Sequence, residues 1–356
     1  MHAFRAALLF CIFSLQLDAA VDLVLRNGYV YDGTGRKPVQ ANVSIHQGRI
    51  VAVGQNPVRG RKILDATGLV VAPGFIDVHT HAENIIYHPK AENFLRMGVT
   101  TLVLGNCGSS KLDIGEFFER MNQVGFSPNI SSLIGHGTVR NQVMGKSFRR
   151  PPAAKELEEM QLYITKGMND GALGMSTGLI YLPGTFAKTD ELVDLSKTVS
   201  EHGGIYVSHM RSEGTNIFKA VDEVCRIGRE AKLPVHISHL KLASSRLLGS
   251  APALLKTLDS ALADGIIISA DIYPYTAWQS TMLILIPDRD PKNQIEIRKA
   301  LNEIAPPESI LFSYFAPYPS YIGKTLREIS DDIGQDPVTV FSSLAKASKK
   351  WTERTG

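Results

Sequence analysis

The sequence predicts an α/β protein built on a (β/α)8 barrel of TIM type, preceded by a smaller β-rich segment. Beyond Leu69, short apolar strands alternate with longer amphipathic segments, which indicates parallel βαβ units. Potential metal ligands follow several of these strands, and such a barrel carries its functional groups at the carboxyl ends of its strands. With 356 residues, 44% hydrophobic and 21% charged, the chain is long enough for one large domain and one small one.

The first 20 residues form a predicted signal peptide. Arg5 is followed by the apolar stretch Ala6 to Leu17, which is too short to span a bilayer but suits the central region of a secretory signal. Cleavage after Ala20 would export the protein to a periplasm or an extracellular space. Asp18 is an unusual neighbour for such a cleavage site, so an uncleaved N-terminal extension on a cytoplasmic protein is the alternative.

Residues 21–68 form the predicted β-rich segment. Short strands are separated by pairs of turn residues, among them Asn27-Gly28 and Gln47-Gly48. Glycine supplies the positive φ that a tight reversal between antiparallel strands requires. We therefore expect hairpins at these two positions.

Residues 69–356 carry the predicted barrel. Seven candidate strands begin near Val70, Thr101, Asn129, Ala172, Ile205, Val235 and Ile266. Amphipathic helices are expected at Ala153 to Asp170, Thr189 to His202, Gly214 to Lys232 and Ala251 to Asp264. A further strand is conceivable at Ile310 to Phe315, although no acid or ligand stands at its end, and a helix is expected at Pro337 to Thr355. Because a closed barrel needs eight strands, the eighth is expected to be missing.

Five potential metal ligands stand just after these strands: His79, His81, Cys107, His209 and His239. Residues two apart on a strand point to the same face, so His79 and His81 can hold one ion between them. Polar loop residues are the plain alternative, but the shared location at strand ends favours a hydrolytic metal site. With three cysteines in all, the chain cannot build a disulfide framework.

An ordered series of short motifs surrounds these ligands. The motifs are Gly74 to His81, Gly98 to Thr101, Gly105 to Gly108, Gly135 to Gly137, Ser176 to Leu179, Ser208 to Arg211, Ile237 to Lys241 and Tyr273 to Tyr275. Together they resemble the D-aminoacylase branch, the N-acyl-D-amino-acid deacylases, of the amidohydrolase superfamily. The resemblance extends from about Asp22 to about Pro337, nearly the whole chain after the predicted signal.

The resemblance implies hydrolysis of the amide bond of N-acyl-D-amino acids by a metal-activated water, giving a carboxylate and a free D-amino acid. It also implies that His79 and His81 hold one metal and that Cys107, His209 and His239 hold another. The cysteine replaces the modified lysine of many other superfamily members, and a thiolate favours zinc over a harder cation. We expect one tightly bound zinc and leave open a second, weaker metal.

The same resemblance implies the substrate-binding residues Lys241, Tyr181 and Tyr275, with Tyr273 as the alternative to Tyr275. Lys241 lies two residues beyond His239 and hence on the same strand face. Its ammonium can therefore pair with the substrate carboxylate in a charge-assisted hydrogen bond. An exposed lysine at the start of a loop is the alternative.

The aspartate that shuttles the proton in this branch, after the last barrel strand in a Gly-Ser-Asp context, has no counterpart in the sequence. Asp331, Asp332 and Asp336 lie in a helical or turn context that suits a solvated surface, and a general acid must first be in reach of its substrate. We therefore expect a fragment or truncated isoform in which the barrel and the family's small β-sandwich are incomplete. The chain as given is then either part of the enzyme or a non-catalytic remnant. A cyclic-amide hydrolase of the same superfamily is disfavoured because the Cys107 motif replaces the expected lysine.

Four residues near the ligands have roles that the pattern leaves open. His136 either lines the pocket or bonds to the backbone in a turn. His236 is expected to face the helices and to pack there. Arg211 and Glu213 either orient His209 by a hydrogen bond or form a surface ion pair.

The charge pattern points to a small-molecule substrate. The formal net charge is +3, and lysine and arginine cluster only at Arg59 to Lys62 and Lys346 to Lys350. Nothing in this distribution indicates a nucleic-acid partner, and no segment predicts a stable membrane span. The sequence does not predict an oligomeric state.

Overall fold

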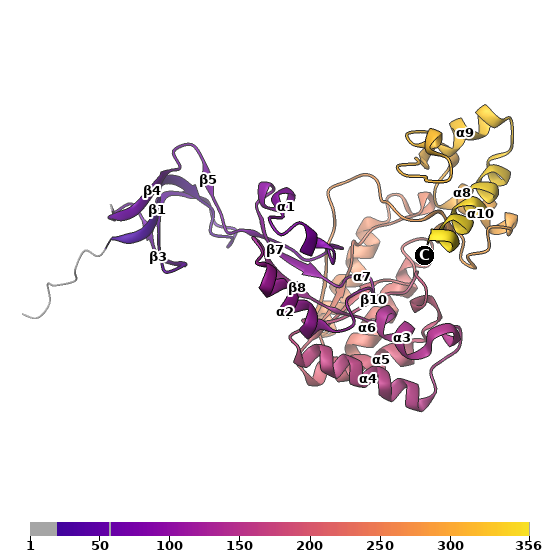
Figure 1. Cartoon of the computed structure of the whole chain (residues 1–356), viewed down its shortest axis with the longest axis horizontal. Helices are drawn as coiled ribbons and strands as arrows, with labels where there is room; N and C mark the ends of the chain where they lie inside the picture. The colour runs from indigo at the N-terminus through magenta and orange to yellow at the C-terminus, as the bar shows by residue number, and fades with distance from the viewer. Residues whose placement is uncertain (1–19, 57, 356) are drawn as a thin grey trace, which may run out of the picture. The chain divides into compact units, whose positions relative to one another are not determined.

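The computed structural model describes residues 20–56 and 58–355 (Figure 1). The predicted signal peptide, apart from Ala20, lies outside the described residues. The chain divides into two compact units, Met1–Phe75 and Ile76–Gly356. Among the described residues, no helix combines the length and the apolar character needed to cross a membrane.

The first unit contains one mixed sheet. Its strands are β1 (Val21–Val30), β2 (Val39–His46), β3 (Arg49–Gly54), β4 (Gly60–Asp65) and β5 (Val70–Val71), in the order β3-β2-β1-β4, with β5 paired to β1. The predicted hairpin at Gln47-Gly48 joins β2 to β3. The hairpin expected at Asn27-Gly28 is wrong, because both residues lie inside β1, where the pairing with β2 shifts register between Leu25 and Gly28.

The predicted first barrel strand also needs correction. Val70 and Val71, which we expected to begin it, pair in parallel with Tyr29 and Val30 of β1 in the small sheet. The strand of the second unit is β6 (Phe75–Asp77), which begins after Pro73 and Gly74. The apolar run from Val70 to Asp77 thus contributes one short strand to each of two sheets, because Pro73 and Gly74 interrupt it.

The second unit contains parallel strands in barrel order. They are β6, β7 (Val99–Leu104), β8 (Asn129–Ser132), β9 (Ile134–Gly135), β10 (Gly174–Gly178), β11 (Ile205–His209), β12 (Val235–Ile237) and β13 (Ile268–Ala270). They form the sheets β6-β7-β8 and β13-β12-β11-β10-β9. Only Leu133 separates β8 from β9, and its N–H donates to the Leu104 carbonyl, so both belong to one predicted strand. Six of the seven predicted strand positions are therefore confirmed, and the first strand of this unit begins at Phe75 rather than at Val70.

Helices alternate with these strands. They are α1 (Glu92–Arg96), α2 (Ile114–Val124), α3 (His136–Met144), α4 (Ala154–Asn169), α5 (Thr189–Glu201), α6 (Ile217–Ala231), α7 (Ala251–Ala263), α8 (Gln294–Glu303), α9 (Leu326–Ile333) and α10 (Pro337–Thr355). The predicted helices α4, α5, α6, α7 and α10 are all confirmed. On α4, α5, α6 and α7, apolar residues recur at helical spacing and pack in one core with strand residues, as on α6, where Val221, Val224 and Ile227 are buried.

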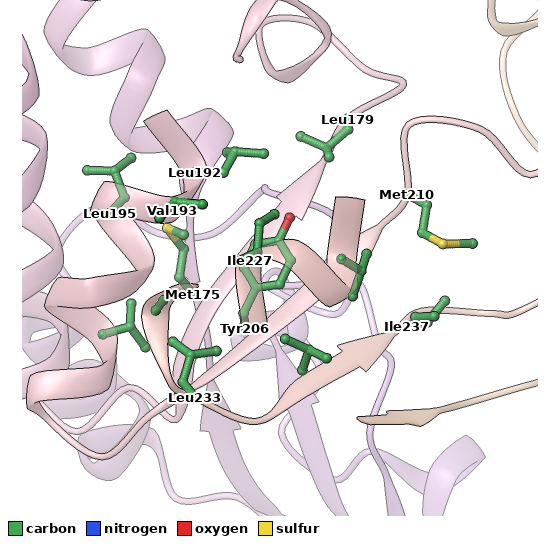
Figure 2. Packing of buried hydrophobic residues seen from close by; sticks show 14 of the residues in the cluster. Met175, Leu179, Leu192, Val193, Leu195, Tyr206, Met210, Ile227, Leu233 and Ile237 are labelled. Atoms are coloured by element: carbon green, nitrogen blue, oxygen red, sulfur yellow. The ribbon is translucent and has the colours of Figure 1, made fainter. Parts of the chain in front are cut away.

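The main core lies between the strands and these helices. Figure 2 shows Met175 and Tyr206 of β10 and β11 packed against Leu192 and Leu195 of α5. All four side chains are fully buried. Burying a side chain of this size contributes about 1.5–3 kcal/mol, so this packing fixes the strands whose ends carry the candidate ligands.

The segment Ile310 to Phe315 does not form the further strand that we considered. Leu311 makes one isolated bridge with Thr325, and Phe312 and Phe315 pack in a second apolar cluster with residues of α8, α9 and α10. Within the described residues, no strand pairs with the free edges of β6 and β13. Ile76 on β6 and Ile267 beside β13 are accordingly 63% and 67% exposed.

Candidate metal centre

Cys107 lies in the loop that follows β7. Gly105 turns the chain with φ +76°, and a Cβ there would lie 2.1 Å from the Leu133 carbonyl oxygen, so the position requires glycine. Asn106 is buried and donates from Nδ2 to the Val103 carbonyl over 3.0 Å. Cys107 itself has φ +53°, which is uncommon for a cysteine and recurs at functional sites. The loop therefore holds the thiol in one strained position.

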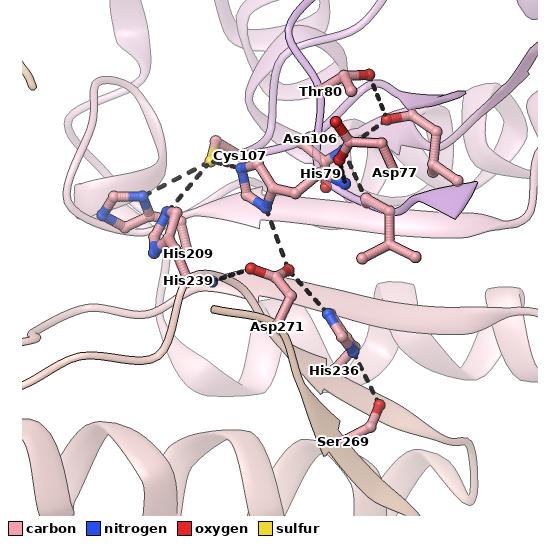
Figure 3. Close-up of polar contacts among 12 residues, drawn as sticks. Asp77, His79, Thr80, Asn106, Cys107, His209, His236, His239, Ser269 and Asp271 are labelled. Atoms are coloured by element: carbon pink, nitrogen blue, oxygen red, sulfur yellow. Dashed lines mark hydrogen bonds and ion pairs between the residues drawn. The ribbon is translucent and has the colours of Figure 1, made fainter. Parts of the chain in front are cut away.

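Three imidazole nitrogens face this thiol (Figure 3). Cys107 Sγ lies 3.4 Å from His79 Nε2, 3.6 Å from His209 Nδ1 and 3.7 Å from His239 Nε2. His209 ends β11, while His79 and His239 each follow their strand by two residues. His239 also has a left-handed backbone, with φ +37°. The parallel strand order thus brings four of the five predicted ligands together.

His81 lies apart from these four residues. Its side chain is exposed, and its ring stands edge-on to His79 with the centroids 5.4 Å apart. Within the described residues, the groups of donor atoms within 4.8 Å of one another are His79, Cys107 and His239, and His209, Glu213 and His239. His79, which the resemblance pairs with His81, therefore contacts both the His81 ring and the Cys107 thiol.

The electrostatics of the cluster suit a cation. Burial, reinforced by the Glu213 and Asp271 carboxylates, raises the pKa of the Cys107 thiol to about 12. Burial also lowers the pKa of His209 to about 3, which keeps that imidazole neutral and able to offer a lone pair. His209 Nε2 is buried and has no hydrogen-bond partner in the described part of the chain. A thiolate at Cys107 requires a nearby cation, and one thiol with three imidazoles is a donor set that fits a divalent transition metal.

Glu213, in the loop after β11, supports one of these ligands. Its Oε1 lies 2.7 Å from His239 Nδ1 and 2.6 Å from Lys241 Nζ. Although burial opposes it, the hydrogen bond from His239 helps to lower the pKa of Glu213. The carboxylate contacts His239 at Nδ1, where the Lys241 ammonium also lies 3.0 Å away, and Nε2 of the ring faces the Cys107 thiol. Glu213 therefore orients His239, not His209 as the sequence suggested.

Asp271 is the residue that the sequence did not single out. It directly follows β13, and its carboxylate lies 3.4 Å from His79 Nδ1 and 2.9 Å from His236 Nε2 (Figure 3). Burial favours the neutral acid, but the hydrogen bonds from His236 and His79 outweigh it and hold the pKa of Asp271 well below its usual range. The expectation that His236 only packs against the helices is wrong, because its ring bonds to Asp271 and to Ser269 Oγ.

Two cavities meet at the cluster. Their volumes are about 640 and 910 Å³, and both are lined by His81, Cys107 and Tyr181. The larger cavity is also lined by Lys241 and Tyr275, so the three predicted substrate-binding residues share one space with the ligands. The sequence predicted that Lys241 and His239 lie on the same face of a strand, and both residues line the larger cavity.

Lys241 and the tyrosines differ in how firmly they are held. Lys241 Nζ is paired with Glu213 and lies 5.7 Å from the centroid of the Tyr273 ring. The Tyr181 ring stands edge-on to His209 with the centroids 4.7 Å apart. Tyr275 is 74% exposed and stacks on Tyr273, the alternative that the sequence left open.

The remaining candidates lie away from the cluster. His136 begins α3 and is fully buried, with Nε2 2.9 Å from Glu191, so it sits in a helix rather than a turn and does not line either of the two cavities described above. Arg211 pairs with Glu223 over 2.9 Å and does not contact His209. Of the two alternatives, the ion pair therefore holds for Arg211, with Glu223 as its partner.

The C-terminal acids lie on the surface, as predicted. Asp331 and Asp332 are exposed on α9, and Asp332 pairs with Lys324 over 2.7 Å. Asp336 precedes α10 and accepts a hydrogen bond from the Val338 N–H. These contacts are structural and place none of the three among the residues that line the two cavities.

Comparison with sequence families and known proteins points to one family. The sequence model of the amidohydrolase family matches residues 62–263, more than half of the chain. An N-acyl-D-glutamate deacylase from Alcaligenes xylosoxydans xylosoxydans is 33% identical over 93% of this chain and 69% of that protein.

Two solved structures resemble the whole fold. A D-aminoacylase, described as defining a novel subset of amidohydrolases, superposes with a TM-score of 0.79 at 31% identity and covers 91% of this chain and 70% of its own. An N-acyl-D-glutamate deacylase from Bordetella bronchiseptica superposes with a TM-score of 0.80 at 30% identity, over 92% of this chain and 70% of its own. That enzyme was solved with zinc and a phosphonate inhibitor that mimics the tetrahedral intermediate of its reaction.

Proposed function

Because the chain belongs to the amidohydrolase family, we propose that it is a metal-dependent deacylase that hydrolyses the amide bond of N-acyl-D-amino acids. The products are a carboxylate and a free D-amino acid. The observation that carries this proposal is the position of Cys107 Sγ, within 3.4–3.7 Å of His79, His209 and His239 at the ends of the barrel strands.

The distances within the cluster support zinc. Tetrahedral zinc, with Zn–S bonds of about 2.3 Å and Zn–N bonds of about 2.0–2.1 Å, separates its sulfur and nitrogen ligands by about 3.6 Å. The distances from Cys107 Sγ to His209 Nδ1 and His239 Nε2, 3.6 and 3.7 Å, are close to this value. Thiolate and imidazole ligands also suit the borderline-soft zinc ion better than magnesium or calcium.

We assign the tight zinc to Cys107, His209 and His239. Three protein ligands leave the fourth tetrahedral position open, as in catalytic zinc sites. His79 lies between Cys107 Sγ and the His81 ring, so the pair His79 and His81 remains the proposed place for a second, weaker metal. The Cys107 thiol contacts residues of both proposed metal positions, His79 of the weaker one and His209 and His239 of the tight one.

The chemistry requires an activated water, a polarised carbonyl and a bound substrate. When bound, zinc acts as a Lewis acid that lowers the pKa of a water molecule and polarises the amide carbonyl. The protein's residues hold the substrate in place. Lys241, Tyr181 and Tyr275 line the larger cavity, where the Lys241 ammonium meets the substrate carboxylate and the tyrosine rings border the amide.

The deciding experiment measures amine release by the zinc-loaded protein from a panel of N-acetyl-D-amino acids and their L enantiomers. We expect release from the D series only. Cys107→Ala should abolish it together with tight zinc binding. Cys225→Ala is the matched control, because Cys225 is a buried cysteine on α6, away from the cluster, and should leave both properties unchanged.

The outcomes separate the hypotheses. Zinc binding without amine release from any D substrate would overturn the proposed activity and favour the non-catalytic alternative. Release that survives in the Cys107→Ala variant would overturn the assigned metal site.

A further inference from the structure

Asp271 has a position in the fold that its sequence context does not reveal. Its main chain continues the parallel pairing of β13 with β12, because its N–H donates to the Ile237 carbonyl and its carbonyl accepts from the Leu240 N–H. The side chain leaves this fixed backbone toward the cluster and is 14% exposed. Asp271 is thus held as rigidly as a strand residue.

The two carboxylate oxygens of Asp271 have different partners (Figure 3). Oδ1 accepts a hydrogen bond from the His239 N–H over 2.6 Å. Oδ2 lies 2.9 Å from His236 Nε2 and 3.4 Å from His79 Nδ1. One side chain therefore contacts two of the histidines that face Cys107, one through its backbone and one through its ring.

The contact with His239 stabilises an unfavourable backbone. His239 has φ +37°, and a non-glycine residue in this region costs on the order of 1–3 kcal/mol unless its surroundings hold it. A charge-assisted hydrogen bond to the backbone N–H offsets part of that cost. The direction in which His239 leaves β12 then depends on Asp271.

The contact with His79 selects a tautomer. A carboxylate only accepts hydrogen bonds, so the proton of the neutral His79 ring must be on Nδ1. Its lone pair is then on Nε2, the nitrogen that lies 3.4 Å from Cys107 Sγ. At His239, by contrast, Nδ1 lies 2.7 Å from Glu213 Oε1 and 3.0 Å from the Lys241 ammonium.

We propose that Asp271 is a positioning residue of the metal centre, which fixes the tautomer of His79 and the backbone of His239 so that both rings present Nε2 to the Cys107 thiol. The proposal rests on the metal site of the proposed function. His236 supports Asp271 in turn, because its ring joins Asp271 Oδ2 to Ser269 Oγ.

The test is Asp271→Asn, which preserves shape but places a donating NH₂ group where the carboxylate accepted. If the amide oxygen remains on the His239 N–H, the NH₂ group meets His79 Nδ1 and favours the opposite tautomer, with the proton on Nε2. The neutral amide also holds the His239 N–H more weakly than the carboxylate does, and His239 is a ligand of the tight zinc. We therefore expect the dissociation constant of that zinc, measured by competition with a chromogenic chelator, to rise ten- to a hundredfold. Asp332→Asn is the matched control, because Asp332 pairs with Lys324 on the surface, and should leave it unchanged.

A second measurement needs only the wild-type protein. In ¹⁵N–¹H spectra of the zinc-loaded, histidine-labelled chain, with the signal assigned by its loss in His79→Gln, we expect a protected proton on His79 Nδ1. A proton-free Nδ1, or full zinc affinity in a folded Asp271→Asn variant, would overturn the proposal. Failure of the wild-type chain to bind zinc would instead overturn the proposed function, so the two failures are distinguishable.

Discussion

The Glu213 carboxylate lies 2.7 Å from His239 Nδ1, and the same oxygen lies 2.6 Å from Lys241 Nζ. One buried carboxylate therefore connects a candidate ligand to a candidate substrate-binding cation. The ammonium and the imidazole compete for this oxygen. If a substrate carboxylate binds the Lys241 ammonium in place of Glu213, then Glu213 keeps only its contact with His239.

This relationship predicts the effect of Glu213→Gln. The amide keeps the size of the side chain but removes the charge that favours the Nδ1 proton of His239. We expect the zinc dissociation constant to rise about tenfold, measured by chelator competition. Glu308→Gln, at an exposed position, is the control. Equal zinc affinity in both variants would show that Glu213 does not orient the ligand.

A second prediction concerns the close approach of β10 to the Cys107 loop. A Cβ at Gly178 would lie 2.2 Å from the Cys107 carbonyl oxygen, and backbone atoms cannot move aside cheaply. Gly178→Ala should therefore displace the thiol, weaken zinc binding and lower the free energy of unfolding by about 1–3 kcal/mol. Gly54→Ala, whose Cβ would meet nothing within 4 Å, is the control for urea unfolding. Unaltered zinc affinity in Gly178→Ala would contradict a rigid loop.

A third prediction concerns the buried ion pair between Arg140 on α3 and Glu191 on α5. Arg140 is fully buried and donates from Nη1 to both carboxylate oxygens of Glu191, over 2.7 and 2.8 Å. Glu191→Gln leaves a buried guanidinium without its counter-charge, which should cost about 3–5 kcal/mol of unfolding free energy. Glu230→Gln breaks the exposed pair with Arg226 and should change the unfolding free energy very little, because solvent screens such a pair. Similar losses in the two variants would contradict this account.

A fourth prediction is a loss of stability at alkaline pH. Tyr206 is fully buried, and burial raises its pKa to about 12 from an unfolded value of about 10. A raised folded-state pKa contributes stability that is complete below pH about 10 and is lost as the pH rises through about 12. The loss is on the order of 3 kcal/mol.

Urea unfolding between about pH 9 and pH 12 measures this loss. Tyr206→Phe should be less stable at neutral pH, because it loses the hydrogen bond between the tyrosine hydroxyl and Thr177 Oγ1. Its stability should nevertheless decline less steeply over this range than that of the wild type. Parallel declines would show that another group titrates.

Much of the fold could be predicted from the sequence because the barrel repeats one local pattern. Apolar strands and amphipathic helices alternate, and ligands that follow strands must meet at one end of a parallel sheet, as Cys107, His209 and His239 do. The boundary errors arose where local pattern and tertiary pairing differ. Val70 and Val71 look like barrel residues but pair with β1, and nothing local marks which sheet they join.

The supporting carboxylates could not be predicted, for a different reason. Asp271 stands 32 residues from His239, and no spacing rule links an acid after one strand to the backbone of a ligand after another. The role of His236 depends on the same contact. Because His236 stands three residues before His239, the alternation of side chains along a strand predicted that the two point to opposite faces. The His236 ring nevertheless reaches the Asp271 carboxylate at the end of the neighbouring strand. Only the pairing of β12 with β13 brings the two together.

The contacts of Cys107 also determine when in folding the site can form. Its partners His79, His209 and His239 stand 28, 102 and 132 residues away along the chain. No short peptide can gather these donors, and the loops between them close only when the intervening strands have docked. Tight zinc binding during refolding should therefore appear late, after the strands have assembled in order, and a metal indicator would time that assembly.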